Sequence, residues 1–171
     1  PPNRGAQLHK GAIEADSDWL LFIHADSRLH KSWAKELFTI INTPSSKRNY
    51  WYFDFKVKEK GIIFRLLEIA VYLRCKLFQT PYGDQGLLIN KELYFQSGGY
   101  SKLHIMEDID LINRLNKINK GKRIGLPIYT SVRKWEKINV IKQAFRNACL
   151  RYRWKKGEDS KKLLQDYYRG Y

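Results

Sequence analysis

A short uninterrupted apolar run at residues 19–23 constrains the fold of this chain more than any other feature. Its boundaries are sharp, because an Asp-Ser-Asp segment precedes it and His24-Ala25-Asp26 follows it. Apolar runs of this length are typical of strands buried on both faces of a parallel sheet. The sequence therefore predicts an α/β core that contains this strand.

Periodicity predicts alternating helices and strands along the rest of the chain. Helices are predicted over 7–15, 32–41, 61–78, 107–120, 138–154 and 161–168, with a helical turn over 91–96. Strands are predicted over 50–57, 86–90 and 123–129, with a loop over 44–48. Strands separated by helices indicate an α/β sheet.

Three residue patterns make these expectations more specific. Alternation in 50–57 places Trp51, Phe53, Phe55 and Val57 on one face. Pro127 cannot donate a backbone hydrogen bond, so the last strand is expected at a sheet edge or with an irregularity. The helix over 107–120 is expected to close at the glycine that follows it.

The charge balance implies an anionic partner. The chain has 171 residues, with 32 Lys and Arg against 17 Asp and Glu, and a formal net charge of +15. Nucleic acid, a phosphorylated substrate and an acidic membrane surface all fit this balance.

The two cysteines, Cys75 and Cys149, lie far apart without a CxxC motif. This disfavours a disulfide scaffold and a structural zinc site, and it makes a reducing cytoplasm the default compartment.

The segment His24-Ala25-Asp26 directly follows the first predicted strand. Ligands of open α/β sheets bind beyond the carboxyl ends of the strands. A carboxylate at such a position can hold a divalent cation that also binds diphosphate oxygens. Asp26 alone is equally compatible with capping the next helix or turn.

Three carboxylates, Glu107, Asp108 and Asp110, stand at the start of a predicted helix. For an isolated acidic helix start, complementing the helix dipole is the simpler explanation. The Gly98-Gly99 pair upstream supplies a flexible turn, and a helix start there can bring Asp108 to the same sheet edge as the first strand. Clustered like charges raise carboxylate pKa values toward those useful for a general base.

Two further segments are weak indicators on their own. Residues 82–86 form a Tyr-Gly-Asp-Gln-Gly loop that can point side chains into a cleft, although a structural turn is the simpler explanation. Residues 130–135 follow a predicted strand and carry Arg133, a donor for phosphate, and Trp135, a wall for a sugar or base. An ordinary strand end with a buried Trp explains this segment equally well.

Taken in order, these motifs resemble glycosyltransferase family 2, and most closely a bacterial subgroup of family 2-like enzymes. The subgroup pattern runs Arg-Gly-x-Gln-x-x-x-Gly-Ala, Leu-Leu-Phe-x-His-Ala-Asp, Gly-Asp-Gln, Met-Glu-Asp-Ile-Asp/Glu and Thr-Ser-x-Arg-x-Trp. In this chain the matching stretches are 4–12, 20–26, 83–85, 106–110 and 130–135. Each motif is weak alone, and five in the right order are a strong indication.

The resemblance implies a GT-A fold, a Rossmann-like mixed sheet flanked by helices. It implies a catalytic domain over 1–137 and a basic amphipathic helical extension over 138–171. The family begins with a strand, a Pro-x-x-Asn-Glu-like loop and a second strand, and nothing like them precedes residue 1. The expectation is therefore an N-terminally truncated sheet without its first strands and nucleotide-binding loop.

The resemblance also implies roles for individual residues. Asp26 matches the last carboxylate of the DxD-type metal motif for Mg²⁺ or Mn²⁺, with His24 in place of its first Asp. Asp108 matches the catalytic base, with Glu107 beside it. Substrate-binding positions are implied as well, on the donor or diphosphate side at Arg4, Gln7, Asp26, Arg133 and Trp135, and on the acceptor or sugar side at Asp84 and Gln85.

The function implied is the inverting transfer of a sugar from a nucleotide diphosphate donor to an acceptor hydroxyl. A UDP-sugar is the favoured donor. The acceptor is unknown, and a lipid-linked acceptor is one candidate. The basic helix over 138–154 fits an anionic membrane surface, which places the enzyme in the cytoplasm, peripheral on the inner face of the cytoplasmic membrane. Two alternatives stay open. One is a basic nucleic-acid-binding module, disfavoured because no recognised motif is present. The other is an inactive truncated glycosyltransferase fragment.

Overall fold

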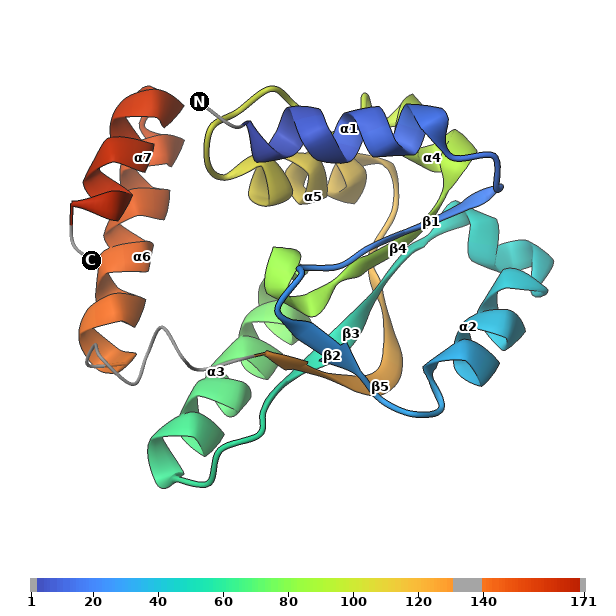
Figure 1. The fold of residues 1–171 in the computed structure, drawn as a ribbon, viewed down its shortest axis with the longest axis horizontal. Helices are drawn as coiled ribbons and strands as arrows, with labels where there is room; N and C mark the ends of the chain where they lie inside the picture. Colours follow the sequence, from blue (N-terminus) through green and yellow to red (C-terminus); the bar gives the residue numbers. More distant parts are fainter. Residues whose placement is uncertain (1–2, 131–139, 170–171) are drawn as a thin grey trace.

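The computed structural model describes residues 3–130 and 140–169, which form a mixed five-stranded sheet flanked by helices (Figure 1). The strand order is β1-β4-β3-β5-β2. Among the described strands, only β3 and β5 pair in parallel, and the other pairs are antiparallel. The strands are β1 (Trp19–Phe22), β2 (Ser27–Leu29), β3 (Tyr50–Val57), β4 (Leu87–Asn90) and β5 (Lys122–Thr130).

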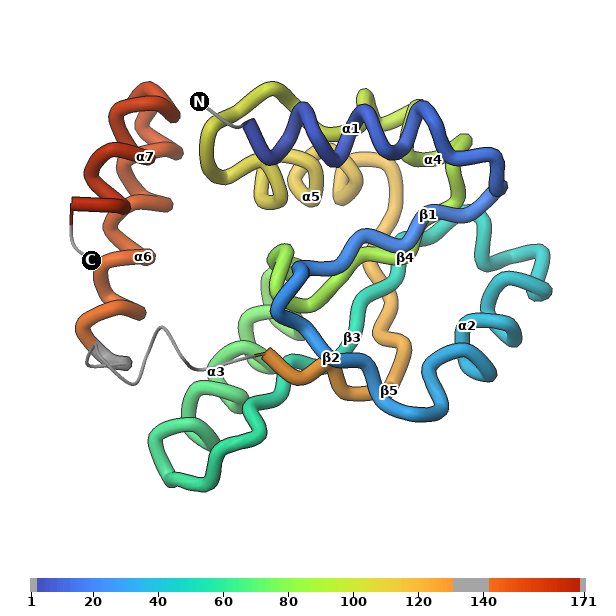
Figure 2. The backbone as a smooth tube through the Cα atoms, viewed as in Figure 1, coloured from blue at the N-terminus to red at the C-terminus, as the bar shows by residue number. Residues whose placement is uncertain are grey.

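Helices cover both faces of the sheet. Tyr50 and Ile89 lie in one core cluster with α1, α3, α4 and α5, whereas Phe53 and Leu88 lie in a second cluster with α2. Figure 2 shows α1 and α5 running side by side on one side of the sheet and α2 on the other. The helices are α1 (Arg4–Glu14), α2 (Trp33–Ile41), α3 (Ile62–Phe78), α4 (Lys91–Gln96), α5 (Glu107–Ile118), α6 (Val140–Lys155) and α7 (Ser160–Tyr168), with 3-10 turns η1 (Pro44–Arg48) and η2 (Gly83–Gln85).

The first predicted strand forms as β1, but the expectation of a parallel strand buried on both faces is wrong. β1 lies at the edge of the described sheet and pairs antiparallel with β4. Leu20 is its one buried residue. The strand buried throughout is β4. An apolar run records hydrophobicity and carries no information about which strand lies beside it.

The expectation that four side chains of β3 share one face is also wrong. Trp51 and Phe53 pack in the cluster with α2, whereas Phe55 and Val57 pack in the cluster with α3. The change of face coincides with an irregularity in the β3–β5 pairing, which advances by two residues on β3 and by four on β5. A bulge of this kind reorients side chains.

The irregularity confirms one half of the expectation for Pro127. Pro127 follows Gly125, whose φ of +82° suits a glycine. β5 as a whole lies between β3 and β2, but β2 pairs only with residues 128–130. Among the described strands, Pro127 therefore has a partner on the β3 side alone, and its lack of an N–H is tolerated there.

The bounds of α1 and the end of α5 differ slightly from their predictions. α1 begins at Arg4, because the Asn3 side chain accepts a hydrogen bond from the Ala6 N–H at 2.9 Å and caps the helix. α5 ends at Ile118, before the expected stop. Gly121 has another reason to be glycine, since a Cβ there would lie 2.5 Å from the Tyr50 ring.

The C-terminal helices α6 and α7 form a pair that packs on the start of α5. Arg153 of α6 donates to Glu158 at 2.6 Å and to Asp166 of α7 at 2.7 Å. Leu150 and Leu163 bury their side chains in a cluster with Met106 and Ile109. The predicted extension thus shares a hydrophobic cluster with the rest of the fold. Over the residues that the structure describes, no helix is both long and apolar enough to cross a bilayer.

Gly5 and Gly11 offer a matched test of how tightly α1 is docked. A Cβ on Gly5 would lie 2.2 Å from the Ser101 carbonyl oxygen, whereas a Cβ on Gly11 meets nothing within 4 Å. We expect Gly5→Ala to lower the free energy of unfolding by about 1–3 kcal/mol through overpacking. Gly11→Ala, in the same helix, should raise it by about 0.5–1 kcal/mol. Urea unfolding followed by far-UV circular dichroism measures both, and equal effects would contradict the tight docking of α1.

Candidate functional site

A cleft of about 640 Å³ opens where the N-terminal turn of α1, the turn after β1, η2 and the start of α5 face α6 and α7. Five residues singled out in the sequence line it, namely Arg4, Gln7, His24, Asp84 and Asp108. They come from four separate stretches of the chain. Clefts of this size with a few convergent polar groups are the usual form of a small-molecule site.

Gly83 is the point at which two of these side chains meet. Its N–H donates to Asp108 Oδ2 at 2.8 Å. A Cβ on Gly83 would lie 2.7 Å from His24 Nε2 and 3.2 Å from Asp108 Oδ2. His24 and Asp108 therefore both lie close to the Gly83 backbone, where a side chain would have to displace the His24 ring.

Asp108 is oriented by its position in the first turn of α5. Its Oδ1 accepts a hydrogen bond from the Ile109 N–H at 2.8 Å. The preceding Met106 caps the helix with a left-handed φ of +69°, one of two positive φ values among described residues other than glycine. Such a conformation costs of order 1–3 kcal/mol and is concentrated at functional sites. The strained turn is what brings Asp108 to the cleft while its neighbour points inward.

That neighbour, Glu107, is buried and forms an ion pair with Arg4 of α1. It does not line the cleft, so its position is beneath the site and not within it. Burial, followed by the proximity of Asp108, raises the pKa of Glu107, and Arg4 opposes this effect. Arg4 keeps about half of its side chain exposed and faces the cleft. The ion pair with Glu107 therefore holds the positively charged Arg4 side chain at the rim of the cleft.

Asp84 is the least satisfied polar group of the cleft. Its Oδ1 is enclosed and has no hydrogen-bond partner among the described residues. Burial raises the pKa of Asp84, nearby Arg74 and His24 lower it, and Asp108 raises it further. Because Asp84 as a residue also lines the cleft, its carboxylate is a candidate ligand for a cation or for a donor group of a substrate.

The other predicted site residues lie elsewhere. Asp26 is exposed in the turn between β1 and β2 and is not among the residues that line the cleft. Gln85 is buried away from it, where its amide donates to the Phe53 carbonyl at 3.2 Å and its Oε1 accepts from Arg74 at 3.0 Å. Arg133 and Trp135 fall outside the described residues.

Residues that the sequence did not single out complete the cleft. The Tyr82 ring lies near two guanidinium groups, with the Arg74 and Arg151 Cζ atoms 3.6 and 5.3 Å from its centroid. Tyr82 and Arg151 both line the cleft, as do Tyr167 and Tyr168 of α7. The basic aromatic composition of the C-terminal segment was visible, but its contact with η2 depends on tertiary packing.

Arg114 holds the loop before α5 in place. It donates to the Gly99 carbonyl at 2.6 Å and to Asp110 Oδ2 at 2.7 Å, and Asp110 also accepts from Ser101 at 2.6 Å. The third carboxylate of the acidic helix start thus has a structural role. A loop clamped at this point keeps the Met106 turn, and therefore Asp108, in position.

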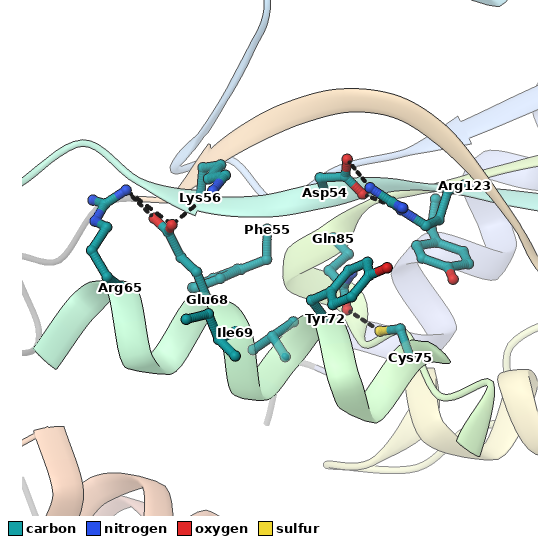
Figure 3. Close-up of a pocket in the computed structure, with 12 residues that line it drawn as sticks. Asp54, Phe55, Lys56, Arg65, Glu68, Ile69, Tyr72, Cys75, Gln85 and Arg123 are labelled. Atoms are coloured by element: carbon teal, nitrogen blue, oxygen red, sulfur yellow. Dashed lines mark hydrogen bonds and ion pairs between the residues drawn. The ribbon is translucent and has the colours of Figure 1, made fainter. Parts of the chain in front are cut away.

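A second cavity of about 350 Å³ lies on the α3 side of β3 (Figure 3). Its charged residues are paired with one another. Arg123 meets Asp54 at 2.7 Å, and Glu68 binds both Lys56 and Arg65 at 2.8 Å. Because the Lys56–Glu68 pair ties α3 to β3 and the Arg123–Asp54 pair ties β5 to β3, the cavity is better explained by packing than by catalysis.

Comparisons with known proteins leave the family open. No protein-family model matches the chain, and a search of curated proteins finds no significant match. Function is therefore argued from the cleft.

The raised pKa of Asp84 gives a pH-dependent prediction. A carboxyl group whose pKa is higher in the folded state stabilises the fold below its unfolded pKa of about 3.9, and that contribution is lost as pH rises through the folded pKa. We expect Asp84→Asn to have a higher Tm than the parent chain at pH 7, because the amide carries no buried charge. The gain should shrink as the pH falls toward 4. Thermal unfolding at both pH values measures it, and a gain independent of pH would exclude buried ionisation as the cause.

Proposed function

We propose that this chain transfers a sugar from a nucleotide diphosphate donor to an acceptor hydroxyl, with inversion, on a GT-A type α/β fold. The observation that carries the proposal is the convergence of Asp108, Asp84, His24 and Arg4 in one cleft. These positions belong to four of the five motifs through which the sequence resembles glycosyltransferase family 2. The motifs are far apart in sequence, so their meeting at one cleft supports the resemblance.

Asp108 is the proposed general base. It lines the cleft, and its two oxygens are oriented by backbone N–H groups of Gly83 and Ile109. In the proposed reaction Asp108 takes the proton of the acceptor hydroxyl while that oxygen bonds to the anomeric carbon. The bond from that carbon to the diphosphate oxygen breaks, and the diphosphate leaves with the bonding electrons. Positioned bases of this kind contribute about 10²–10⁴-fold to a rate.

Cations and aromatic rings at the rim suit the donor. Arg4 and Arg151 line opposite parts of the cleft, and a guanidinium group binds phosphate through paired N–H donors. Tyr82 presents a ring beside Arg151, which can contact the flat face of a base or sugar. Arg133 and Trp135 remain proposed contributors to diphosphate or acceptor binding on the strength of the motif alone.

A divalent cation, Mg²⁺ or Mn²⁺, belongs to this proposal. Within 3–130 and 140–169, no three His, Cys, Asp or Glu side chains cluster closely enough to form a complete protein site. Mg²⁺ needs only one or two protein carboxylates when substrate phosphates supply the other oxygens. The carboxylate of Asp84, which lines the cleft, fits such a ligand, in addition to the motif residues Asp26 and His24. When bound, the cation would neutralise the departing diphosphate.

The favoured donor is a UDP-sugar. The two further partners proposed are a lipid-linked acceptor and an anionic membrane surface. Both are compatible with the basic helix α6, which exposes Phe145 and Tyr152. Nucleic acid binding is the rival explanation of the +15 charge. Peripheral location on the cytoplasmic face of a membrane follows from the same reasoning.

Calorimetric titration of UDP, GDP and UDP-sugars, with and without Mn²⁺, tests the site. We expect metal-dependent binding that is weakened at least tenfold, about 1.4 kcal/mol, by Asp84→Ala. Asp26→Ala separates the two candidate metal positions, because a loss there would assign the cation to the exposed turn. Absence of nucleotide binding by the folded chain, together with tight binding of an oligonucleotide, would overturn the proposal.

Asp108→Asn tests the assignment of the base. The amide keeps the size of the side chain but cannot accept the proton, so we expect donor binding to persist and transfer to fall by about 10²–10⁴-fold. Release of UDP in the presence of an acceptor measures the rate. Asp18→Asn is the matched control, because Asp18 is exposed and outside the cleft. Undiminished transfer by Asp108→Asn would exclude Asp108 as the base.

A further inference from the structure

Helix α3 leaves an apolar stripe facing solvent. The stripe consists of Ile62, Leu66, Ile69, Leu73 and Leu77, whose exposed fractions are 81%, 55%, 54%, 44% and 67%. The spacing of three and four residues puts all five on one side of the helix. Soluble proteins rarely expose contiguous apolar surfaces of this extent without a binding role.

The opposite side of α3 is already used to hold the helix on the sheet. Val71 and Cys75 are buried in the main core cluster. Glu68 reaches toward β3, where it accepts from the Val57 N–H at 2.9 Å and binds Lys56 and Arg65 (Figure 3). The stripe is therefore an extra apolar face on a helix whose docking is complete.

The exposed charges around the stripe are positive, and Glu59, between Lys58 and Lys60, is half-buried. Lys58 and Lys60 are exposed just before the helix, and Lys76 is exposed near its end. Glu68 is the sole carboxylate within α3, and it is buried and paired. An apolar helix face bordered by lysines is the pattern of helices that lie in the interface of an anionic membrane.

We propose that the stripe of α3 seats the protein on an anionic lipid bilayer, with the five apolar side chains in the acyl boundary and the lysines among the phosphates. The alternative partner for the stripe is a second copy of the chain. Pairing two stripes would bring Lys58, Lys60 and Lys76 of one copy close to those of the other, and like charges across an interface oppose association. The same charges favour an anionic lipid surface. This inference does not depend on glycosyl transfer.

Vesicle sedimentation of the whole chain tests the inference. The probe is phosphatidylcholine vesicles with and without phosphatidylglycerol, at low and high NaCl. We expect binding to the anionic vesicles only, weakened by salt. Leu66→Gln with Ile69→Gln should lower the partition coefficient at least about tenfold, because two apolar side chains no longer enter the bilayer.

The matched control is Phe38→Gln, which removes an apolar side chain that is 70% exposed on α2. It should leave vesicle binding unchanged, and the Tm of each variant checks that the fold persists. A third variant, Phe145→Gln with Tyr152→Gln, removes the exposed aromatic residues of α6. Loss of binding in the α6 variant with none in the α3 variant would overturn the inference. So would equal binding to neutral vesicles, or a dimer in analytical ultracentrifugation that the α3 variant dissociates.

Discussion

The docking of α1 against the start of α5 is the contact on which the candidate site depends. Glu107 is buried there, and burying a carboxylate is costly unless a cation and hydrogen bonds compensate. Arg4 supplies the cation, and the absence of a side chain on Gly5 lets the helix approach the Ser101 carbonyl. Because Glu107 points inward, the helical turn directs Asp108 outward to the cleft. One buried ion pair thus sets the orientation of the proposed base.

Several residues of the cleft adopt arrangements that lower the stability of the folded state. Asp84 has an unpartnered buried oxygen, Met106 adopts a left-handed conformation, and His24 and Asp108 crowd Gly83. Each feature is unfavourable in isolation, and surrounding contacts such as the Arg114 clamp hold them in place. Concentration of unfavourable features in one cleft is expected where binding or catalysis is the reason for them.

Part of the site was accessible from the sequence and part was not. Motif order identified Arg4, Gln7, His24, Asp84 and Asp108, and these line one cleft. Neighbours in the same motifs behave differently, since Gln85 and Glu107 turn into the core and Asp26 stays exposed. Side-chain direction within a motif depends on local backbone turns that residue type alone does not specify. The wall formed by Tyr82 and Arg151 depends on contacts between segments far apart in the chain.

The amino-acid sequence by itself determined the described helices and four of the five described strands, because apolar periodicity and capping residues act locally, whereas the short strand β2 was not predicted. It also determined the cationic character and the apolar spacing along α3, whereas the docking of α3 on the sheet decided that this apolar face is exposed. Tertiary structure alone decided that β1 lies antiparallel at an edge, that β5 carries a bulge opposite Tyr52 and Asp54, and that α6 and α7 wall the cleft. Strand order and helix docking follow from summed burial and pairing over the whole chain, so no local pattern encodes them.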